Sequence, residues 1–282
     1  MIKQLSMIRF HPLFWVMAGA AVFTGFFYDI MLLFLIIFLH ELGHAFAALH
    51  FKWRIKKIVL LPFGGMMETE EHGNRPIFEE IIVAAAGPAV HVPLISLSFL
   101  LLHTPFWTTA DHTMFVYYNI TLLCFNLLPV WPLDGGKLMF CLYMSIFPYY
   151  WAQKKMWWTS CLVLGGLTVL LFFYYPLHLQ GWLLLLFFII IHYTEWKQQP
   201  YSFFRFLMAK NTLDHHVHHT RFTDKKISWH ARPVDAAKYI GKNKVTSFFI
   251  IENGQTLPES YILEAIVKKR RGLIKFIDLL SE

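Results

Sequence analysis

The stretch IMLLFLIIFLHELGHAFAAL, residues 30–49, decides how the chain folds. It predicts a membrane-spanning helix, since about 20 apolar residues in a helix cross the hydrocarbon core. The helix carries His40-Glu41-Leu42-Gly43-His44, and histidines four residues apart share a face from which both can reach one metal ion. Glu41 can act as a base toward a water molecule on that metal. Because such side chains are costly in hydrocarbon, we expect them to face an internal cavity and to have a function there.

The composition indicates that most of the chain is solvated by lipid. Of its 282 residues, 56% are hydrophobic and 15% are charged, whereas soluble domains carry about a quarter charged residues. Of the 25 Lys and Arg residues, the majority fall at or after Lys197. We therefore expect a membrane domain at 1–196, an interfacial linker at 197–222 and a small soluble domain at 223–282. Topology and contact with anionic lipid in the bilayer explain the net charge of +7, so direct nucleic-acid binding is not expected.

Six segments are apolar enough to be interpreted as membrane helices. They are residues 12–27, 30–49, 81–102, 113–131, 157–175 and 177–193. Lys and Arg residues occur before the first segment, in the second and fourth connections, and after the sixth segment, and the other connections contain none. All basic residues then lie on one side of the membrane, which the positive-inside rule makes the cytoplasm. The sequence therefore predicts a multi-pass membrane protein with both termini in the cytoplasm.

Outside these segments, the pattern predicts a short hairpin and a small α/β module. Within residues 51–80, basic and apolar side chains alternate from Lys52 to Leu61 and a break follows at Pro62-Phe63-Gly64-Gly65. This is typical of a hairpin or re-entrant strand, with a turn near the headgroups as the alternative. A strand near residues 60–68 could pair with an extended substrate segment. Residues 200–209 suit a helix in the membrane interface. In the tail we expect a helix opening at Pro233, a strand at 245–252 and a helix at 260–271.

A third metal ligand is expected because a catalytic zinc ion uses three protein ligands and one open position. The best candidate is Asp134, in the stretch NLLPVWPLDGG at residues 126–136. Two prolines break the fourth apolar segment just before it, so the chain can turn an acid toward the metal. Gly135 and Gly136 permit close approach of other backbone. Asn126 either contacts the substrate or oxyanion, or holds the broken helix by a hydrogen bond.

These residues resemble the site-2 protease family of intramembrane metalloproteases. That family pairs His-Glu-x-x-His with a later Asn-x-x-Pro-x-x-x-Leu-Asp-Gly, and residues 126–135 fit the second motif without departure. The resemblance implies that His40, His44 and Asp134 bind zinc and that Glu41 is the catalytic acid and base. It extends to the sporulation branch of the family through Leu61-Pro62-Phe63-Gly64-Gly65, Glu71-His72-Gly73-Asn74-Arg75-Pro76 and Ala86-Gly87-Pro88.

The sporulation branch implies further properties. The substrate would be a membrane-tethered sigma-factor precursor, cut from the mother-cell side of the outer membrane that surrounds the forespore. Membrane protein partners would inhibit the enzyme until a signal arrives. The tail is similar to a single cystathionine-beta-synthase module, a type that often pairs and binds adenine nucleotides such as ATP. A homo-oligomer formed through the C-terminal domain would follow from such pairing.

Two other functions use the same residues. A metal or proton transporter would employ them as a path, although transporters commonly show paired broken helices and only the fourth segment is clearly broken. A regulated binding protein that has lost turnover would not require Glu41. His91 either lines the cavity or packs internally. His72 and the tract His215-His216-Val217-His218-His219 are interpreted as loop and linker residues, with a functional metal role as the alternative.

Overall fold

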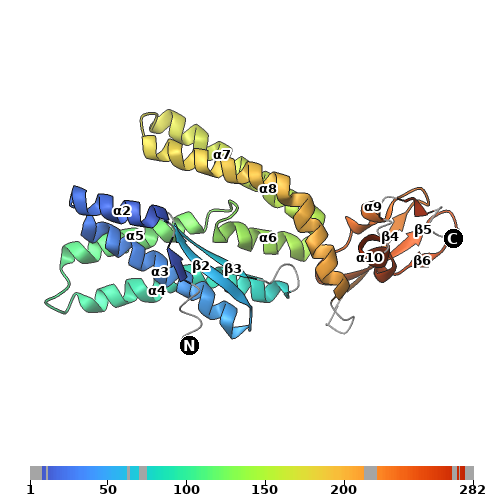
Figure 1. The fold of residues 1–282 in the computed structure, drawn as a ribbon, viewed down its shortest axis with the longest axis horizontal. Coiled ribbons are helices and arrows are strands. Elements are labelled where there is room, and N and C mark those ends of the chain that lie inside the picture. Colours follow the sequence, from blue (N-terminus) through green and yellow to red (C-terminus); the bar gives the residue numbers. More distant parts are fainter. Residues whose placement is uncertain are drawn as a thin grey trace. The chain divides into compact units, whose positions relative to one another are not determined.

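The computed structural model describes residues 8–10, 12–61, 64–69, 75–212, 221–268, 272 and 274–276. The chain divides into two compact units, Met1–Glu71 with Phe78–Leu138, and His72–Ile77 with Met139–Glu282. The elements of both are labelled in Figure 1. His72 and the tract at 215–219 lie outside the described residues, so their predicted roles stay predictions.

The first unit is built from helices that flank a small sheet. Its second helix, α3, covers the whole of residues 30–49 and begins at Phe27, three residues before the predicted segment. The turn before it lies at Gly25, whose φ of 79° is a left-handed conformation that favours glycine. The helices of this unit are α2 (Pro12–Thr24), α3 (Phe27–His50), α4 (Ile77–Leu101), α5 (Thr109–Asn126) and the start of α6 (Asp134–Ile146).

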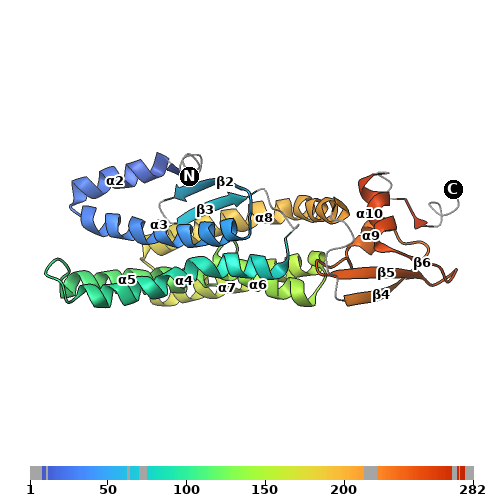
Figure 2. The same cartoon turned by 90° about the horizontal axis from the view of Figure 1, so that it is seen from below.

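The hairpin predicted at 51–80 is present as β2 (Ile55–Leu61) and β3 (Gly64–Thr69), which pair antiparallel. A strand that the sequence did not indicate, β1 (Ile8–Phe10), adds to it in parallel and gives the order β1-β2-β3. The sheet lies along α3 (Figure 2). Because β3 is at one end of this order, one of its edges is free of a neighbouring strand among the described residues.

Apolar contacts position α3 against its neighbours. Leu32 and Ile36 pack with Phe115 of α5, and Ala47 and Ala48 pack with Val83 of α4. Between membrane helices such contacts stabilise by van der Waals packing rather than by removal of apolar surface from water. The face of α3 that carries the polar motif is therefore held against α4 and α5.

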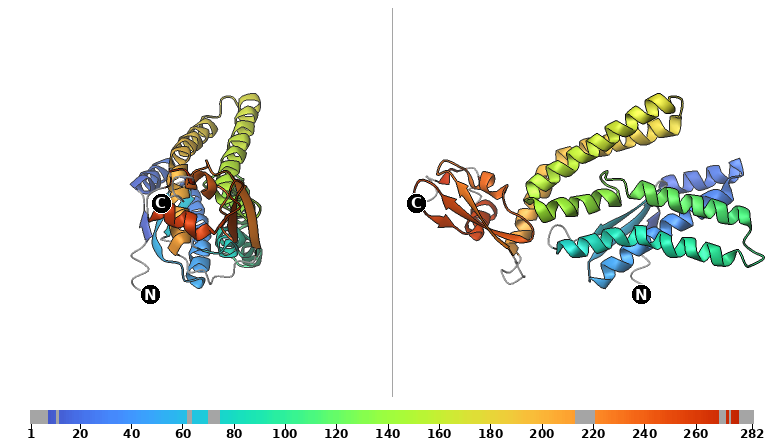
Figure 3. Two further views of the ribbon diagram at one scale, coloured as in Figure 1. Left: turned by 90° about the vertical axis from the view of Figure 1, so that its right-hand side faces the viewer. Right: turned by 180° about the vertical axis from the view of Figure 1, so that it is seen from behind.

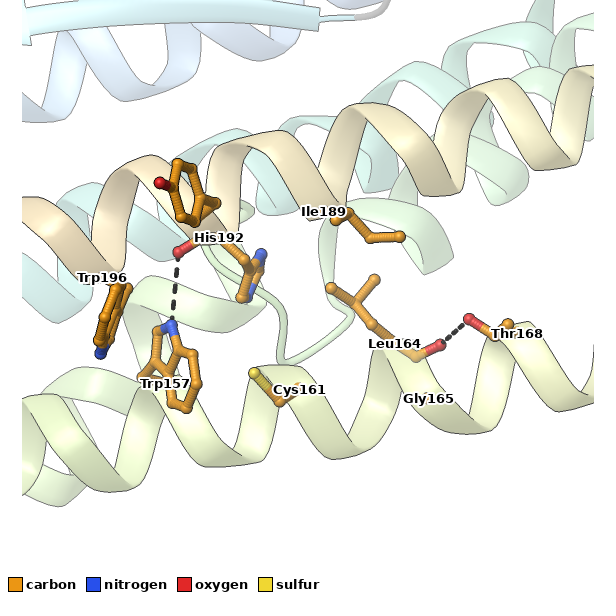
Figure 4. A pocket seen from close by; sticks show the side chains of 9 residues that line it. Trp157, Cys161, Leu164, Gly165, Thr168, Ile189, His192 and Trp196 are labelled. Atoms are coloured by element: carbon orange, nitrogen blue, oxygen red, sulfur yellow. Dashed lines mark hydrogen bonds between the residues drawn. The ribbon is translucent and has the colours of Figure 1, made fainter.

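The second unit contains a long helical hairpin, α7 (Tyr149–Tyr174) and α8 (Leu179–Thr212), which pack side by side (Figure 3). Between them is a cavity of about 380 Å³, into which His192 points near Cys161 (Figure 4). The His192 ring is buried, and its Nδ1–H donates to the carbonyl of Phe188 at 3.1 Å. Its Nε2 has no hydrogen-bond partner within the described part of the chain.

Four of the described helices are long and apolar enough to cross a membrane, namely α3, α4, α7 and α8. The chain is thus a helical membrane protein, and four of the six predicted segments correspond to such helices. The other two form shorter elements: α2 has 13 residues, or about 20 Å, and α5 ends at Asn126 rather than 131.

The tail forms an α/β module around a three-stranded sheet of order β4-β5-β6. The predicted helix at Pro233 and strand at 245–252 are present as α9 and β5, and the last predicted helix ends four residues earlier than expected, as α10. The elements are β4 (Arg221–Ile227), α9 (Pro233–Ala237), β5 (Lys244–Ile250), β6 (Thr256–Leu257) and α10 (Glu259–Val267).

The helix expected in the membrane interface at 200–209 is not separate. α8 continues through Pro200 to Thr212, and Phe203, Phe206 and Leu207 are buried in one cluster with the module's core. Lys210 adds a buried ion pair to Glu259 at 2.8 Å. The boundary predicted at residue 196 therefore falls inside a continuous helix, because the apolar face of this segment packs on protein.

Candidate metal centre

Three of the predicted site residues converge on one point. The Nε2 atoms of His40 and His44 lie 3.1 Å apart, and each lies 3.0 Å from Oδ2 of Asp134. All three side chains are buried, at 4% exposure each. Side chains from α3 and from the first residue of α6, 90 and 94 positions apart in sequence, thus meet in a buried region.

The local sequence explains how Asp134 reaches the histidines. α5 ends at Asn126 and a turn at 127–133 leads to α6, as the two prolines predict. A Cβ atom on Gly135 would lie 2.1 Å from the carbonyl oxygen of Leu127, and one on Gly136 would lie 2.5 Å from that of Val130. Only glycine allows the turn to fold this closely against the first turn of α6.

The hydrogen bonds of His44 and Asp134 orient the atoms that converge at this point. His44 Nδ1 lies 2.7 Å from the carbonyl oxygen of Val83. Since a carbonyl only accepts, Nδ1 carries the proton and Nε2 presents its lone pair to the centre. The Lys137 ammonium donates to Oδ1 of Asp134 at 2.9 Å, which leaves Oδ2 directed at the two imidazoles.

This donor set fits a zinc ion. Two imidazole nitrogens and one carboxylate oxygen are zinc ligands, with bonds of about 2.0–2.2 Å. In a tetrahedral site such ligands lie about 3.3 Å apart, close to the separations of 3.0–3.1 Å observed here. Nδ1 of His44 already has its own partner, as ligating histidines generally require.

Glu41 and Asn126 complete the predicted set. Glu41 is buried. One of its carboxylate oxygens and one ring nitrogen from each of His40 and His44 all lie within 4.8 Å of one another. Asn126 is the half-buried last residue of α5. Among the described residues it makes no hydrogen bond to His40, Glu41, His44 or Asp134, so its predicted role stays a prediction.

The sequence left the role of His91 open and did not select Asn119. His91, whose role was left between lining a cavity and packing, is fully buried and contacts Nδ1 of His40 at 3.1 Å. Asn119 contacts His91 in turn at 2.9 Å. A polar residue inside a membrane segment is itself a signal of function, and that rule would have selected both.

The comparisons with known proteins agree with this geometry. The sequence model of peptidase family M50 matches residues 28–113 and 107–167. Stage IV sporulation protein FB of Bacillus subtilis (strain 168) is 40% identical over 203 residues, which cover 72% of this chain and 70% of that protein. This chain belongs to peptidase family M50.

Two further matches of this M50 peptidase come from Methanocaldococcus jannaschii. A zinc metalloprotease of that organism is 34% identical over 113 residues, covering 39% of this chain and 32% of that protein. The solved structure of a site-2 protease from the same organism matches with a TM-score of 0.52 and 26% identity, covering 67% of this chain and 89% of that one. The chain is therefore a membrane zinc metalloprotease of the site-2 protease family.

Proposed function

We propose that this M50 peptidase is an intramembrane endopeptidase that removes the pro-sequence of a membrane-tethered sigma-factor precursor. The observation that carries the proposal is the buried convergence of His40, His44 and Asp134 from two separate helices of a membrane protein. The likeness to stage IV sporulation protein FB supports a sporulation substrate.

In this proposal each residue of the centre has one role. His40, His44 and Asp134 hold zinc, which when bound supplies a Lewis acid that activates water and polarises a peptide carbonyl. Glu41 accepts a proton from the attacking water and delivers it to the leaving amide nitrogen. Lys137 holds Oδ1 of Asp134 and so keeps Oδ2 turned to the histidines. Asn126 stays a candidate for contact with the substrate or the oxyanion.

The free edge of β3 offers a way to present the substrate. A helical substrate hides its carbonyl groups in its own hydrogen bonds, so it has to become extended before it can be cut. β3 lies along α3, the helix that carries His40, Glu41 and His44. An extended segment added to this edge would be held by backbone hydrogen bonds beside that helix.

We further propose six membrane crossings, with α2 and α5 as the two additional ones, and both termini in the cytoplasm of the mother cell. The placement of Lys and Arg supports this orientation, and the enzyme would reside in the outer membrane around the forespore. Inhibitory membrane partners, pairing of chains through the C-terminal module, a cystathionine-beta-synthase type for that module and nucleotide binding by it stay predictions from the sequence.

Co-expression of the full chain with membrane-tethered sigma-factor precursors tests the proposal. The intact enzyme should shorten a precursor, while Glu41→Gln should abolish the cut and still purify with zinc. Asp134→Asn should lower both zinc content and cleavage, because the amide is a poorer ligand than the carboxylate. Cleavage by Glu41→Gln would refute the assigned base, and metal or proton uptake by vesicles without any cleavage would favour the transporter alternative.

A further inference from the structure

A chain of buried hydrogen bonds leads from the backbone of α5 to His40. It runs from the Phe115 carbonyl to Nδ2 of Asn119 at 2.8 Å, and from Oδ1 of Asn119 to Nδ1 of His91 at 2.9 Å. Nε2 of His91 then contacts Nδ1 of His40 at 3.1 Å. Asn119 and His91 are both fully buried, at 0% exposure.

The direction of every proton in this chain follows from its first member. The Phe115 carbonyl can only accept, so the amide of Asn119 must point its NH₂ group there and its oxygen toward His91. Nδ1 of His91 must then carry a proton, which leaves a lone pair on its Nε2. Nδ1 of His40 donates to that lone pair, and Nε2 of His40 presents its own lone pair toward His44 and Asp134.

We propose that His91 and Asn119 are positioning residues that fix the tautomer and ring orientation of His40 for zinc binding. The inference rests on the proposed role of His40 as a zinc ligand. The usual partner of a ligating histidine is a carboxylate, a backbone carbonyl or water, and His44 has such a partner in Val83. For His40 the partner is a second imidazole, whose own tautomer is set by an amide on a third helix.

This arrangement makes the zinc affinity depend on α5, which supplies no ligand. When the acceptor at position 91 is removed, Nδ1–H of His40 loses the partner that the described residues give it in these buried surroundings. The ring can then rotate or carry its proton on Nε2, where it blocks the ligand lone pair. Changes in the partner of a ligating histidine typically lower metal affinity by about 10–100-fold.

The test is the zinc affinity of the purified full-length protein in detergent, measured by competition with a chromogenic chelator. We expect His91→Leu to weaken zinc binding by about 10–100-fold. His91→Gln should restore affinity to within about threefold of the intact protein, because its Oε1 can occupy the position of the imidazole Nε2 and accept from His40. If His91 only filled space, His91→Leu would instead keep a higher zinc affinity than His91→Gln, since leucine packs better than glutamine in an apolar site.

Ser98→Ala provides the matched control. Ser98 is buried in the same unit and links Nδ1 of His112 at 2.9 Å with Nε1 of Trp107 at 3.0 Å, but it touches none of the three ligands. Its loss removes two part-buried hydrogen bonds of the same unit and should leave zinc affinity unchanged. An equal loss in Ser98→Ala and His91→Leu would overturn the inference, as would unchanged affinity in His91→Leu.

If His91→Leu does not fold, Asn119→Leu carries the same test, because it frees the tautomer of His91. Weaker zinc binding supports the inference and unchanged binding overturns it. Suppose that the intact protein cleaves, that Glu41→Gln does not, and that His91→Leu binds zinc normally. That result would refute this inference and leave the proposed function in place. Absence of zinc binding by the intact protein would sink the proposed metal centre and the inference together.

Discussion

Replacement of Gly87 by alanine should disable the metal centre without unfolding the helix that contains it. A Cβ atom at this position of α4 would lie 2.2 Å from Nε2 of His44 and 2.7 Å from Nε2 of His40. Ordinary contact begins at 3.4 Å, so the ring of His44 or the backbone of α4 has to move by about 1.2 Å. Because Gly87 has no side chain, α4 leaves space for the Nε2 atoms of both histidines.

Neither ring can yield by that amount and keep its contacts. His44 is held through Nδ1 by the Val83 carbonyl at 2.7 Å, and His40 is held through Nδ1 by His91 at 3.1 Å. A displacement of about 1 Å at a catalytic group can cost about 100-fold in rate. We therefore expect Gly87→Ala to lower cleavage by about 100-fold or more and to purify with less zinc.

The assay is cleavage of a tethered precursor together with the zinc content of the purified protein. Gly165→Ala in α7 is the control, since apart from the adjacent residues and nearby backbone of its own helix no heavy atom of the described chain lies within 4 Å of its Cβ position, and alanine is favoured over glycine in a helix by about 1 kcal/mol. Both variants should fold. Gly87→Ala with zinc content and cleavage within threefold of the intact enzyme would refute the steric reasoning.

Three further outcomes can be checked on the full chain. Lys210→Met should destabilise the C-terminal module by about 3–5 kcal/mol, because Glu259 is left as a buried charge without its ion-pair partner. The double variant Lys210→Met with Glu259→Leu should recover part of this loss. Denaturation followed by tryptophan fluorescence measures the stability of both variants. His192→Leu should be neutral or stabilising by up to about 1 kcal/mol, since it removes a buried nitrogen without a partner among the described residues, and a large drop in thermal stability would contradict this. The pKa of Glu252 is lowered because its carboxylate accepts hydrogen bonds from the Ser228 hydroxyl and the Trp229 backbone N–H. The stabilisation that these bonds give the folded module is fully present above the unfolded pKa of about 4.3. It is lost as pH falls through the lower pKa of the folded state. Ser228→Ala should therefore make the unfolding free energy less dependent on pH in the acid range.

The parts of the site that local rules govern were predictable from the sequence. Helical spacing places His40 and His44 on one face, and the two prolines before Asp134 end α5 and allow the turn to α6. The hairpin at β2 and β3 follows from alternation around a Pro and Gly break. Each of these conclusions depends on residues that are neighbours in the chain.

The features that the sequence did not reveal depend on distant partners. β1 joins β2 across more than 40 residues of intervening chain, and no local pattern encodes that pairing. Charge placement predicted a boundary at Lys197, but Phe203 and Phe206 are buried against the C-terminal module, and α8 continues through this point. An apolar helix face has the same pattern whether it packs on lipid or on protein, so composition alone could not separate these cases.

α3 and α4 pack closely at Gly43 and Gly87, and this packing connects the motif on α3 with side chains of α4 that the sequence did not assign to the site. A Cβ on Gly43 would lie 2.5 Å from Val90 and 2.8 Å from the Ala86 carbonyl, just as one on Gly87 would meet the two histidines. Glycine on both helices therefore permits a backbone approach of the kind that small residues give in membranes. That approach brings Val83 and His91, eight residues apart on α4, to the Nδ1 atoms of His44 and His40. The two glycines thus allow the hydrogen bonds that orient His44 and His40. The contact of His91 with His40 depends on this packing of α4 on α3, which the sequence of α4 alone does not show.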